Sequence, residues 1–241
     1  MSVMSYREFT MGQSSILSQN LKVLYEDSQI IAVFKPHRVL TQADDTGDES
    51  LFEAVKAWIK TKYSKPGNVF LGLIHRLDRP AAGIVVFAKT SKAASRLSEQ
   101  IRNHAFKKKY RTWVSKGLNP AKGSLVNYLD FNKQDRKALV YSEPKGERQK
   151  AILNYQSIRS ENGQYLLEIE LITGRKHQIR AQLAALGSPI VGDKKYGAKD
   201  NYKEGVIALE ACYVSFLHPT LKEMIEIKIT EEESGIIGGF I

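Results

Sequence analysis

Apolar and polar residues follow one another along this chain in short blocks, and most of the blocks have the pattern of strands. Residues 21–34 are rich in Val, Ile, Leu and Tyr, with a polar break at 26–28 that predicts a hairpin ending at Lys35-Pro36. The apolar run 84–88 is continuous, which predicts a buried strand. Apolar runs or alternation predict further strands at 110–114, 151–158, 165–172 and 225–229.

Three other segments, 51–63, 91–106 and 175–186, have apolar residues at helical spacing and are predicted to be helices. The last is the clearest, because Leu183 and Leu186 share a face with Ile179 and a glycine follows where a helix would end. Strands outnumber helices and come in adjacent runs. We therefore predict an α+β fold with a mixed, largely antiparallel sheet and flanking helices, rather than a doubly wound sheet.

The chain contains no internal repeat and no Pro/Gly/Ser-rich linker, so one folded domain is expected at 21–232. We predict a mobile N-terminal tail at 1–20 and a C-terminal tail at 233–241. Residues 118–150 are polar, rich in Lys and poorly patterned, which predicts a surface excursion.

The charge balance is strongly basic, with Lys+Arg 36 against Asp+Glu 26, a net charge of +10 and a pI near 9.5. This surplus favours a polyanionic partner, because each neutralised phosphate releases condensed counterions, but charge alone leaves a merely basic protein open. No stretch approaches the length of a membrane-spanning helix, and no secretory signal is recognisable, so we expect no membrane association. The single cysteine, Cys212, cannot form an internal disulfide, which fits a cytoplasmic location.

The densest group of chemically active side chains is His75-Arg76-Leu77-Asp78-Arg79-Pro80-Ala81-Ala82-Gly83, just before the buried strand. Two flanking arginines favour the ionised form of Asp78, and the proline and glycine restrict the loop backbone. The pattern fits either a catalytic carboxylate or a structural Arg–Asp ion pair in a turn, and composition alone favours the ion pair.

Two further groups are basic. The stretch Thr173-Gly174-Arg175-Lys176-His177-Gln178-Ile179-Arg180 opens the clearest helix, where basic side chains and free backbone N–H groups can bind an anion, unless the helix end is simply solvated. Residues 106–111 place Tyr110 beside four basic residues, which suits stacking on a base and contact with phosphate. A half-buried tyrosine with solvated lysines would give the same pattern.

Cofactor chemistry has little support in the sequence. His75 and Asp78 are three residues apart without a matching pair of metal ligands, and the other histidines lie in unrelated contexts. A Gly-rich phosphate loop, a dinucleotide fingerprint and a hydrolase elbow are also missing. We therefore expect an enzyme, if it is one, to work without metal or cofactor.

These groups, in this order, resemble the motifs of the RluA-type pseudouridine synthases. The family's central motif is His-Arg-Leu-Asp, two variable residues, Thr-Ser-Gly and a strand ending in Ala-Lys-Thr, and this chain has HRLDRPAAGIVVFAKT. The family's later motif corresponds to TGRKHQIRAQLAALGSPIVGDKKYG, and the elements IIAVFKP and KKKYRTWVSKG also occur in the expected order. The resemblance covers about residues 21–230, and four motifs in sequence make it specific.

The resemblance implies a pseudouridine-synthase-like fold with a central RNA-binding cleft, and an enzyme that isomerises specific uridines in structured RNA, either ribosomal or transfer RNA. Nothing in the sequence demands more than a monomer, so a monomer is expected. The resemblance also implies that Asp78 is the nucleophile or charge stabiliser, that Arg180 pairs with it, and that Tyr110 packs on the uracil and moves a proton. Arg76 would fill the space left by the flipped uridine. The other residues expected to contact substrate are His75, Arg175, Lys176, His177 and Lys35.

The chain departs from the family pattern at three places. Ala81-Ala82 stand where Thr-Ser is usual, Arg38 stands where a glycine usually follows Lys-Pro, and Glu210 stands where a histidine is common. These departures bear on how the catalytic loop is supported and how the substrate fits.

Two alternatives stay open. A non-catalytic RNA-binding protein on the same fold would not require Asp78, Arg180 and Tyr110 together. A base-removing glycosylase would also flip its target, but it would change the mass of the RNA, whereas isomerisation would not.

Overall fold

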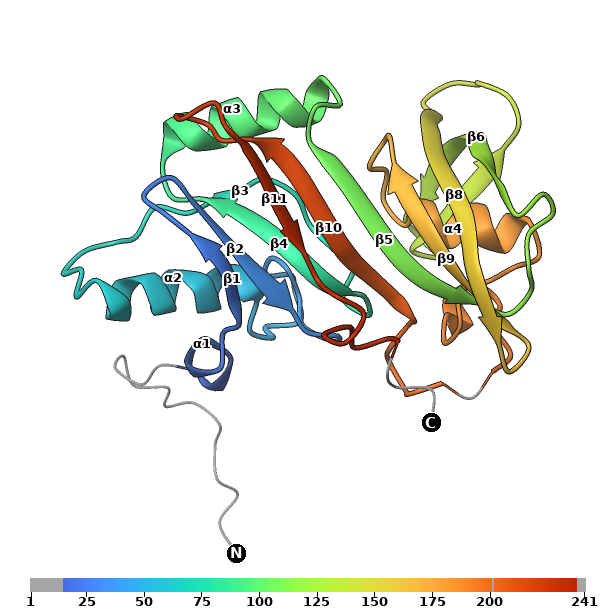
Figure 1. The fold of residues 1–241 in the computed structure, drawn as a ribbon, viewed down its shortest axis with the longest axis horizontal. Helices are drawn as coiled ribbons and strands as arrows, with labels where there is room; N and C mark the ends of the chain where they lie inside the picture. The colour runs from blue at the N-terminus through green and yellow to red at the C-terminus, as the bar shows by residue number, and fades with distance from the viewer. Residues whose placement is uncertain (1–14, 201, 238–241) are drawn as a thin grey trace, which may run out of the picture.

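A single mixed sheet dominates the computed structural model, which describes residues 15–200 and 202–237 (Figure 1). Its strands follow the main order β1-β2-β4-β10-β5-β9-β8-β6-β7, with β3 added beside β4 and β11 beside β10. The strands are β1 (Val23–Glu26), β2 (Ile30–Lys35), β3 (Gly72–Leu73), β4 (Ala82–Ala88), β5 (Lys107–Val114), β6 (Lys122–Asn132), β7 (Lys137–Tyr141), β8 (Gln149–Glu161), β9 (Gln164–Leu171), β10 (Leu209–Leu217) and β11 (Met224–Lys228). Within the described residues every pairing of these strands is antiparallel except that of β4 with β10, so the predicted α+β class is confirmed.

Two helices cover opposite faces of the first half of the sheet. Helix α2 (Leu51–Lys62) packs its buried residues against Phe87 of β4, and α3 (Ser91–Arg102) packs against Val86 on the other face. All seven residues of β4 are therefore buried, which explains why its sequence is one continuous apolar run. Both helices begin at side-chain caps, Ser50 and Thr90, and the second cap lies one residue before the predicted start.

Helix α4 (Gln178–Ala185) packs against the second half of the sheet, where Ile179 and Leu183 share a core with residues of β8 and β9. It begins three residues later than predicted, because His177 has φ 56° and therefore ends the irregular segment in a left-handed conformation. The short helices α1 (Ile16–Gln19) and η1 (Lys194–Tyr196) complete the described part of the chain.

Gly83 allows the two halves of the sheet to meet. Its φ is 122°, and a Cβ at this position would lie 2.4 Å from both the backbone nitrogen and the backbone oxygen of Ala211. Only glycine permits this close approach of β4 and β10, where Ala82 pairs with Glu210 and Gly83 with Ala211. The loop that precedes β4 is thereby placed next to β5.

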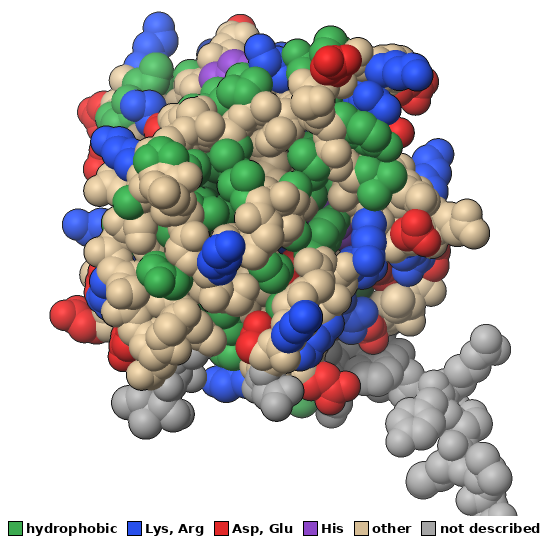
Figure 2. All heavy atoms as spheres, turned by 90° about the vertical axis from the view of Figure 1, so that its right-hand side faces the viewer, with side chains coloured by type: hydrophobic (Ala, Val, Ile, Leu, Met, Phe, Trp, Pro, Cys, Tyr) green, Lys and Arg blue, Asp and Glu red, His purple; other side chains and the backbone are tan. Residues whose placement is uncertain are grey.

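The predicted surface excursion at 118–150 is wrong, because β6 and β7 lie in this range and extend the sheet. The pair forms the edge of the sheet, so only some residues, such as Leu129 and Ala138, are buried. Figure 2 looks onto this end of the molecule and shows apolar side chains in the middle of the face, with lysines and arginines scattered around them. Because each strand buries a single residue and also exposes apolar side chains such as Val126 and Leu139, the usual alternation of a half-buried strand is weak here.

Parts of both predicted tails are ordered against the domain. Ser18 in α1 is buried, and so is Ile236, whose carbonyl oxygen accepts a hydrogen bond of 3.0 Å from the Trp113 indole. The Glu210 carboxylate accepts hydrogen bonds from the Ser234 hydroxyl and the Gly235 amide at 2.6 and 3.1 Å, and burial raises the pKa of Glu210. Residues 1–14 and 238–241 of the predicted tails lie outside the described part. In that part, every helix is too short or too polar to cross a membrane.

Candidate active site

A cavity of about 520 Å³ lies between the loop before β4, the inner face of β5 and the start of α4. Asp78 is the only aspartate or glutamate among the described residues that line it. The cations Arg76, Arg102, Lys108 and Arg175 also line this cavity. A single carboxylate therefore faces an otherwise basic pocket, which suits a ligand that carries several negative charges.

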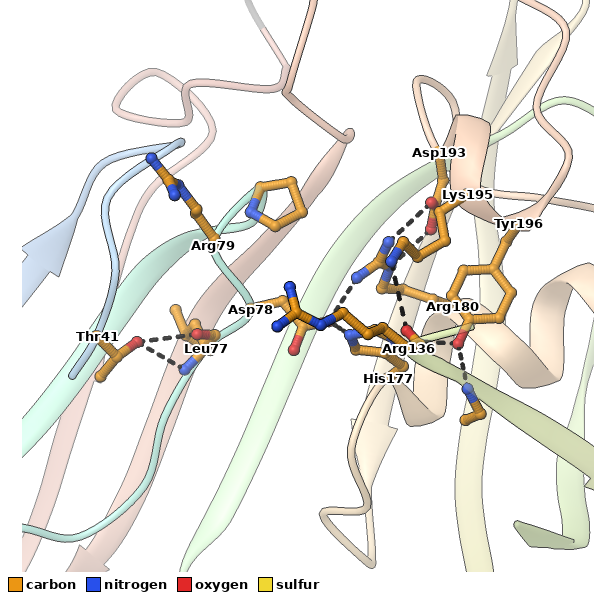
Figure 3. A network of polar contacts seen from close by, with 12 residues as sticks. Thr41, Leu77, Asp78, Arg79, Arg136, His177, Arg180, Asp193, Lys195 and Tyr196 are labelled. Carbon is orange, nitrogen blue, oxygen red and sulfur yellow. Dashed lines mark hydrogen bonds and ion pairs between the residues drawn. The ribbon is translucent and has the colours of Figure 1, made fainter. Parts of the chain in front are cut away.

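Arg180 links Asp78 to a second carboxylate, that of Asp193 (Figure 3). Its Nε and Nη2 donate to the two oxygens of Asp193 at 2.7 and 2.9 Å, while Nη1 donates to Oδ2 of Asp78 at 2.9 Å. Burial disfavours the charge on Arg180, but the hydrogen bonds and charges of Asp193 and Asp78 outweigh it and raise its pKa. Asp193 thus fixes the guanidinium by a bidentate contact, and Arg180 in turn fixes one oxygen of Asp78.

The loop that carries Asp78 is held by the segment after β2. The Thr41 hydroxyl donates to the Leu77 carbonyl oxygen at 2.9 Å and accepts from the Leu77 amide at 3.1 Å (Figure 3). The Arg38 amide donates to the Arg79 carbonyl oxygen at 2.8 Å, and a turn is closed from the Ala81 amide to the Asp78 carbonyl at 3.1 Å. These contacts hold the loop without the two hydroxyls that Ala81-Ala82 lack.

Lys35 was predicted to contact substrate, but it lies buried beneath the Asp78 loop and does not line the cavity. Its side chain is fully buried, and its ammonium group donates to the carbonyl oxygens of Pro36, Val39 and Arg79 at 2.9, 2.7 and 3.2 Å. Burial lowers its pKa to about 7, while the nearby charge of Asp78 acts in the opposite direction. With all three donors used inside the protein, Lys35 supports the Asp78 loop and does not reach the cavity surface.

The inner face of β5 forms the floor of the cavity. Phe106 precedes this strand, and with Lys108 and Tyr110 it lines the cavity at every second position, as the two-residue period of a strand requires. Burial and the charge of Asp78 raise the pKa of Tyr110, so its hydroxyl stays protonated. The Lys108 ammonium group has no hydrogen bond or ion pair within the described residues, and burial lowers its pKa.

His177 comes close to Asp78 from the start of α4. Its Nε2 lies 3.7 Å from Oδ2 of Asp78, and its Nδ1 lies 3.0 Å from the hydroxyl of Tyr196. Burial lowers the pKa of His177 to about 4, so the ring is neutral around pH 7. Figure 3 also draws Arg136, from the turn between β6 and β7, whose backbone carbonyl oxygen accepts a hydrogen bond of 3.4 Å from the Lys195 ammonium group.

His75 lines the cavity, where a substrate contact was predicted; its Nδ1 has no hydrogen-bond partner in the described residues, whereas its Nε2 is held by the protein. Its Nε2 accepts the Val86 amide at 3.1 Å, and its ring lies 5.5 Å from that of Phe106. Burial lowers the pKa of His75 to about 3, so it is neutral and supports the cavity wall.

The remaining predicted contacts, Arg76, Arg175 and Lys176, are exposed, and the first two line the cavity. Arg76 has no hydrogen bond or ion pair within the described part of the chain, and its side chain is free to meet a ligand. Arg175 donates from Nε to the Lys150 carbonyl at 3.0 Å, and Lys176 places its ammonium group 3.7 Å from the centre of the Phe131 ring. Burial and the charge of Arg76 lower the pKa of Lys176.

The structure thus brings together Asp78, Arg180 and Tyr110, which lie far apart in the sequence. It adds Asp193, Tyr196 and Lys108, which the sequence reasoning did not single out. Asp193 and Tyr196 lie in the late stretch PIVGDKKYG, and Lys108 begins the Lys-x-Tyr element. All three could therefore have been found by examining every residue of these two motifs. Among the residues described, no three His, Cys, Asp or Glu side chains are grouped as metal ligands.

Comparison with known proteins identifies the family. Residues 29–185 match the sequence model of the family described as RNA pseudouridylate synthase. The ribosomal large subunit pseudouridine synthase C of Buchnera aphidicola subsp. Baizongia pistaciae is 32% identical over 222 residues, which are 88% of this chain and 67% of the relative. The ribosomal large subunit pseudouridine synthase D of Zymomonas mobilis subsp. mobilis is 29% identical over 217 residues, which are 86% of this chain and 68% of the relative.

A solved structure shows the same fold. Human RNA Pseudouridylate Synthase Domain Containing 4 superposes with a TM-score of 0.75 at 22% identity, covering 92% of this chain and 93% of the human one. The matched segment 29–185 contains the Asp78 loop, β5 and α4, which are the elements that build the cavity. The chain belongs to the RNA pseudouridylate synthase family and is an RNA isomerase.

Proposed function

We propose that this enzyme isomerises a uridine in ribosomal RNA, with Asp78 as its catalytic residue. The observation that carries the assignment is the Asp78 carboxylate, which is 26% exposed at the cavity while Arg180 beside it is only 5% exposed. Relatives named for the large ribosomal subunit favour ribosomal RNA over transfer RNA. We further infer that the protein acts as a monomer, because all the residues that line the cavity come from one chain, and in the cytoplasm, where its single cysteine would stay reduced.

The reaction needs little from the protein beyond position and charge. The C1′–N1 bond breaks, the uracil turns, and a C1′–C5 bond forms, while C5 loses a proton and N1 gains one. Atoms and electrons balance without oxidant, reductant or water. In this scheme Asp78 stabilises or traps the detached sugar or base, and Arg180 keeps its carboxylate in place.

Tyr110 lies beneath the place where the uracil would sit. Because burial and the charge of Asp78 raise the pKa of its hydroxyl, Tyr110 stays protonated, so it can donate a hydrogen bond to the base but is a weak acid and cannot accept a proton in this form. If so, Tyr110→Phe slows turnover and leaves RNA affinity unchanged. Turnover equal to that of the parent would reduce Tyr110 to a packing surface.

The basic rim would hold the RNA while the uridine leaves its stack. Arg76 is exposed and planar, so it can occupy the space that the flipped base vacates. Lys108, Arg175 and Lys176 line or border the same cavity and would contact phosphates. The unpaired Lys108 ammonium group is the strongest candidate, because no protein group competes for it within the described residues.

The test is isomerisation by the purified protein of ribosomal and transfer RNA from cells that lack the gene. Pseudouridine is detected by carbodiimide modification and primer extension, and RNA mass is measured in parallel. We expect one or a few uridines of ribosomal RNA to react without change in mass. Asp78→Asn should abolish the reaction and retain RNA binding, since phosphate contacts supply most of the affinity.

Asp130→Asn is the matched control, because Asp130 is exposed on β6 and neither lines the cavity nor contacts Arg180. Turnover by Asp78→Asn at the parental rate would refute the assignment. Loss of a base would identify a glycosylase, and binding without conversion by the parent would identify a non-catalytic RNA-binding protein. Reaction only in transfer RNA would refute the choice of RNA.

A further inference from the structure

A chain of hydrogen bonds runs from the edge strand β7 to the side of Asp78. The backbone amide of Ala138 lies 2.7 Å from the Tyr196 hydroxyl oxygen, and this oxygen lies 3.0 Å from Nδ1 of His177. On the far side of the imidazole, Nε2 lies 3.7 Å from Oδ2 of Asp78. Figure 3 shows Tyr196, His177 and Asp78 following one another in this order.

The direction of these hydrogen bonds fixes the protons. An amide N–H can only donate, so the Tyr196 oxygen accepts from Ala138. The hydroxyl proton then has one acceptor within the described residues, which is Nδ1 of His177. If Nδ1 instead carried the proton, the Tyr196 hydroxyl would lack an acceptor and an Nε2 lone pair would face a carboxylate oxygen. Both consequences are unfavourable in a buried site.

The surroundings hold the ring in this position. The rings of Phe131 and Tyr196 lie 5.6 and 5.7 Å from the imidazole and nearly perpendicular to it, at 80° and 82°. The side chain of His177 is 11% exposed. Its charged neighbours are Asp78 from the catalytic loop, Arg180 of α4, Lys176 of the preceding turn and Lys195 of η1. Burial and the three cations disfavour protonation of the ring, and together they outweigh the opposite effect of the single carboxylate.

We propose that Tyr196 and the Ala138 amide are a positioning pair that holds His177 in the neutral form protonated on Nε2, so that His177 donates to Oδ2 of Asp78 once RNA fills the cavity. This inference rests on the proposed role of Asp78. The gap of 3.7 Å is too long for a hydrogen bond, and a shift of about 1 Å would close it. Oδ2 would then have two donors, His177 and Arg180.

Oδ1 of Asp78 has no hydrogen-bond partner within the described residues, so it remains the oxygen that reacts. The two oxygens of one carboxylate would thus be divided, one held by donors and one presented to the uridine. The arrangement also connects catalysis to the β6–β7 hairpin, because the donor that starts the chain is a backbone amide of β7.

The tautomer can be measured in the protein alone, independently of activity. Nitrogen-15 NMR distinguishes a protonated ring nitrogen from a bare one by its chemical shift. We expect His177 to show a protonated Nε2 and a bare Nδ1 throughout pH 5.5–8. A protonated Nδ1, or a charged ring at pH 6, would overturn the inference while leaving the role of Asp78 untouched.

Two variants connect the tautomer to turnover. Tyr196→Phe removes the hydroxyl and should lower kcat about tenfold with little change in KM, because a hydrogen bond to a charged group is affected. The same variant should show mixed protonation of the two ring nitrogens. Tyr141→Phe removes a hydroxyl at the other end of β7, which has no contact with the site, and is the control. Equal kcat in Tyr196→Phe and the parent would refute the positioning role.

Substitution of His177 itself separates this role from folding. The amide nitrogen of a glutamine can stand near the position of Nε2, whereas that of an asparagine reaches only as far as Nδ1. Asparagine, however, tolerates the left-handed backbone at φ 56° better than glutamine. We therefore expect His177→Gln to be more active than His177→Asn although it is no more stable. The opposite order of activities would contradict donation from Nε2.

Discussion

Replacing Asp193 by asparagine should destabilise the fold much more than the same change at Asp78. Both carboxylates contact Arg180, but the Asp193 side chain is 1% exposed and makes two hydrogen bonds, whereas the Asp78 side chain is 26% exposed and makes one. Removing one partner from a buried ion pair costs about 3–5 kcal/mol. Asparagine keeps the shape and one acceptor, so the lower end of that range, about 3 kcal/mol, is expected for Asp193→Asn.

For Asp78→Asn the loss is smaller, because Arg180 keeps its bidentate partner and solvent screens the exposed carboxylate. A free energy of about 1 kcal/mol or less is expected. In a domain of this size each kcal/mol shifts Tm by roughly 2–4 °C, so Asp193→Asn should lower Tm by roughly 6–12 °C and Asp78→Asn by roughly 4 °C at most.

The assay is urea and thermal unfolding of the parent and both variants, followed by circular dichroism, together with turnover on RNA. Asp78→Asn is expected to be nearly as stable as the parent and inactive, whereas Asp193→Asn should be unstable and retain part of its turnover at low temperature. Equal destabilisation by the two changes would refute the view that Asp193 fixes Arg180 and that Arg180 in turn fixes Asp78.

Three other changes test separate parts of the structure. Lys108→Ala should weaken RNA binding and reduce the slope of log K against log salt by about one, whereas the exposed control Lys107→Ala should leave the slope nearer the parental value. Arg38→Gly should raise stability by about 0.5–1 kcal/mol, since Arg38 has φ 67°, and a measured loss would contradict strain there. The free energy of unfolding should fall from pH 6.5 to pH 4, because His75 and His177, with pKa values of about 3 and 4, stay neutral in the folded protein while the unfolded chain binds protons at both. This fall should be smaller in His177→Gln than in the parent, and the same pH dependence in both proteins would contradict the contribution of His177.

Local pattern predicted several buried elements of the fold, but it missed the central strand β10, which is buried along most of its length. The continuous apolar run of β4 and the helical spacing of α2 reflect burial on both faces of the strand and on one face of the helix. The edge hairpin of β6 and β7 could not be recognised, because each strand buries only one residue and exposes apolar side chains such as Val126 and Leu139, so the usual alternation is lost. The start of α4 was misplaced because His177 has a left-handed conformation, which apolar spacing and helix propensity do not reveal.

For the candidate site, the sequence motifs brought Asp78, Tyr110 and Arg180 to attention, and the structure places all three at one cavity. What the motifs could not give is the direction in which each side chain points. Lys35 is as basic as Lys108, yet its ammonium group is enclosed by three carbonyl oxygens of neighbouring loops. The role of Tyr196 depends on a backbone amide 58 residues away, for which no residue type in the sequence gives a signal.

The hydrogen bonds that hold the Asp78 loop bear on whether the protein or the RNA changes conformation on binding. Thr41 clamps the peptide of Leu77 in both directions, and Lys35 and Arg38 both donate to the carbonyl of Arg79. A loop held this firmly loses little conformational entropy when a ligand arrives, so the reorganisation free energy falls on the RNA. Unstacking a uridine requires a few kcal/mol, and less where the base is already loosely stacked. We therefore expect the loop to favour RNA sites that are already flexible, so that discrimination among uridines would depend on how easily the nucleic acid deforms.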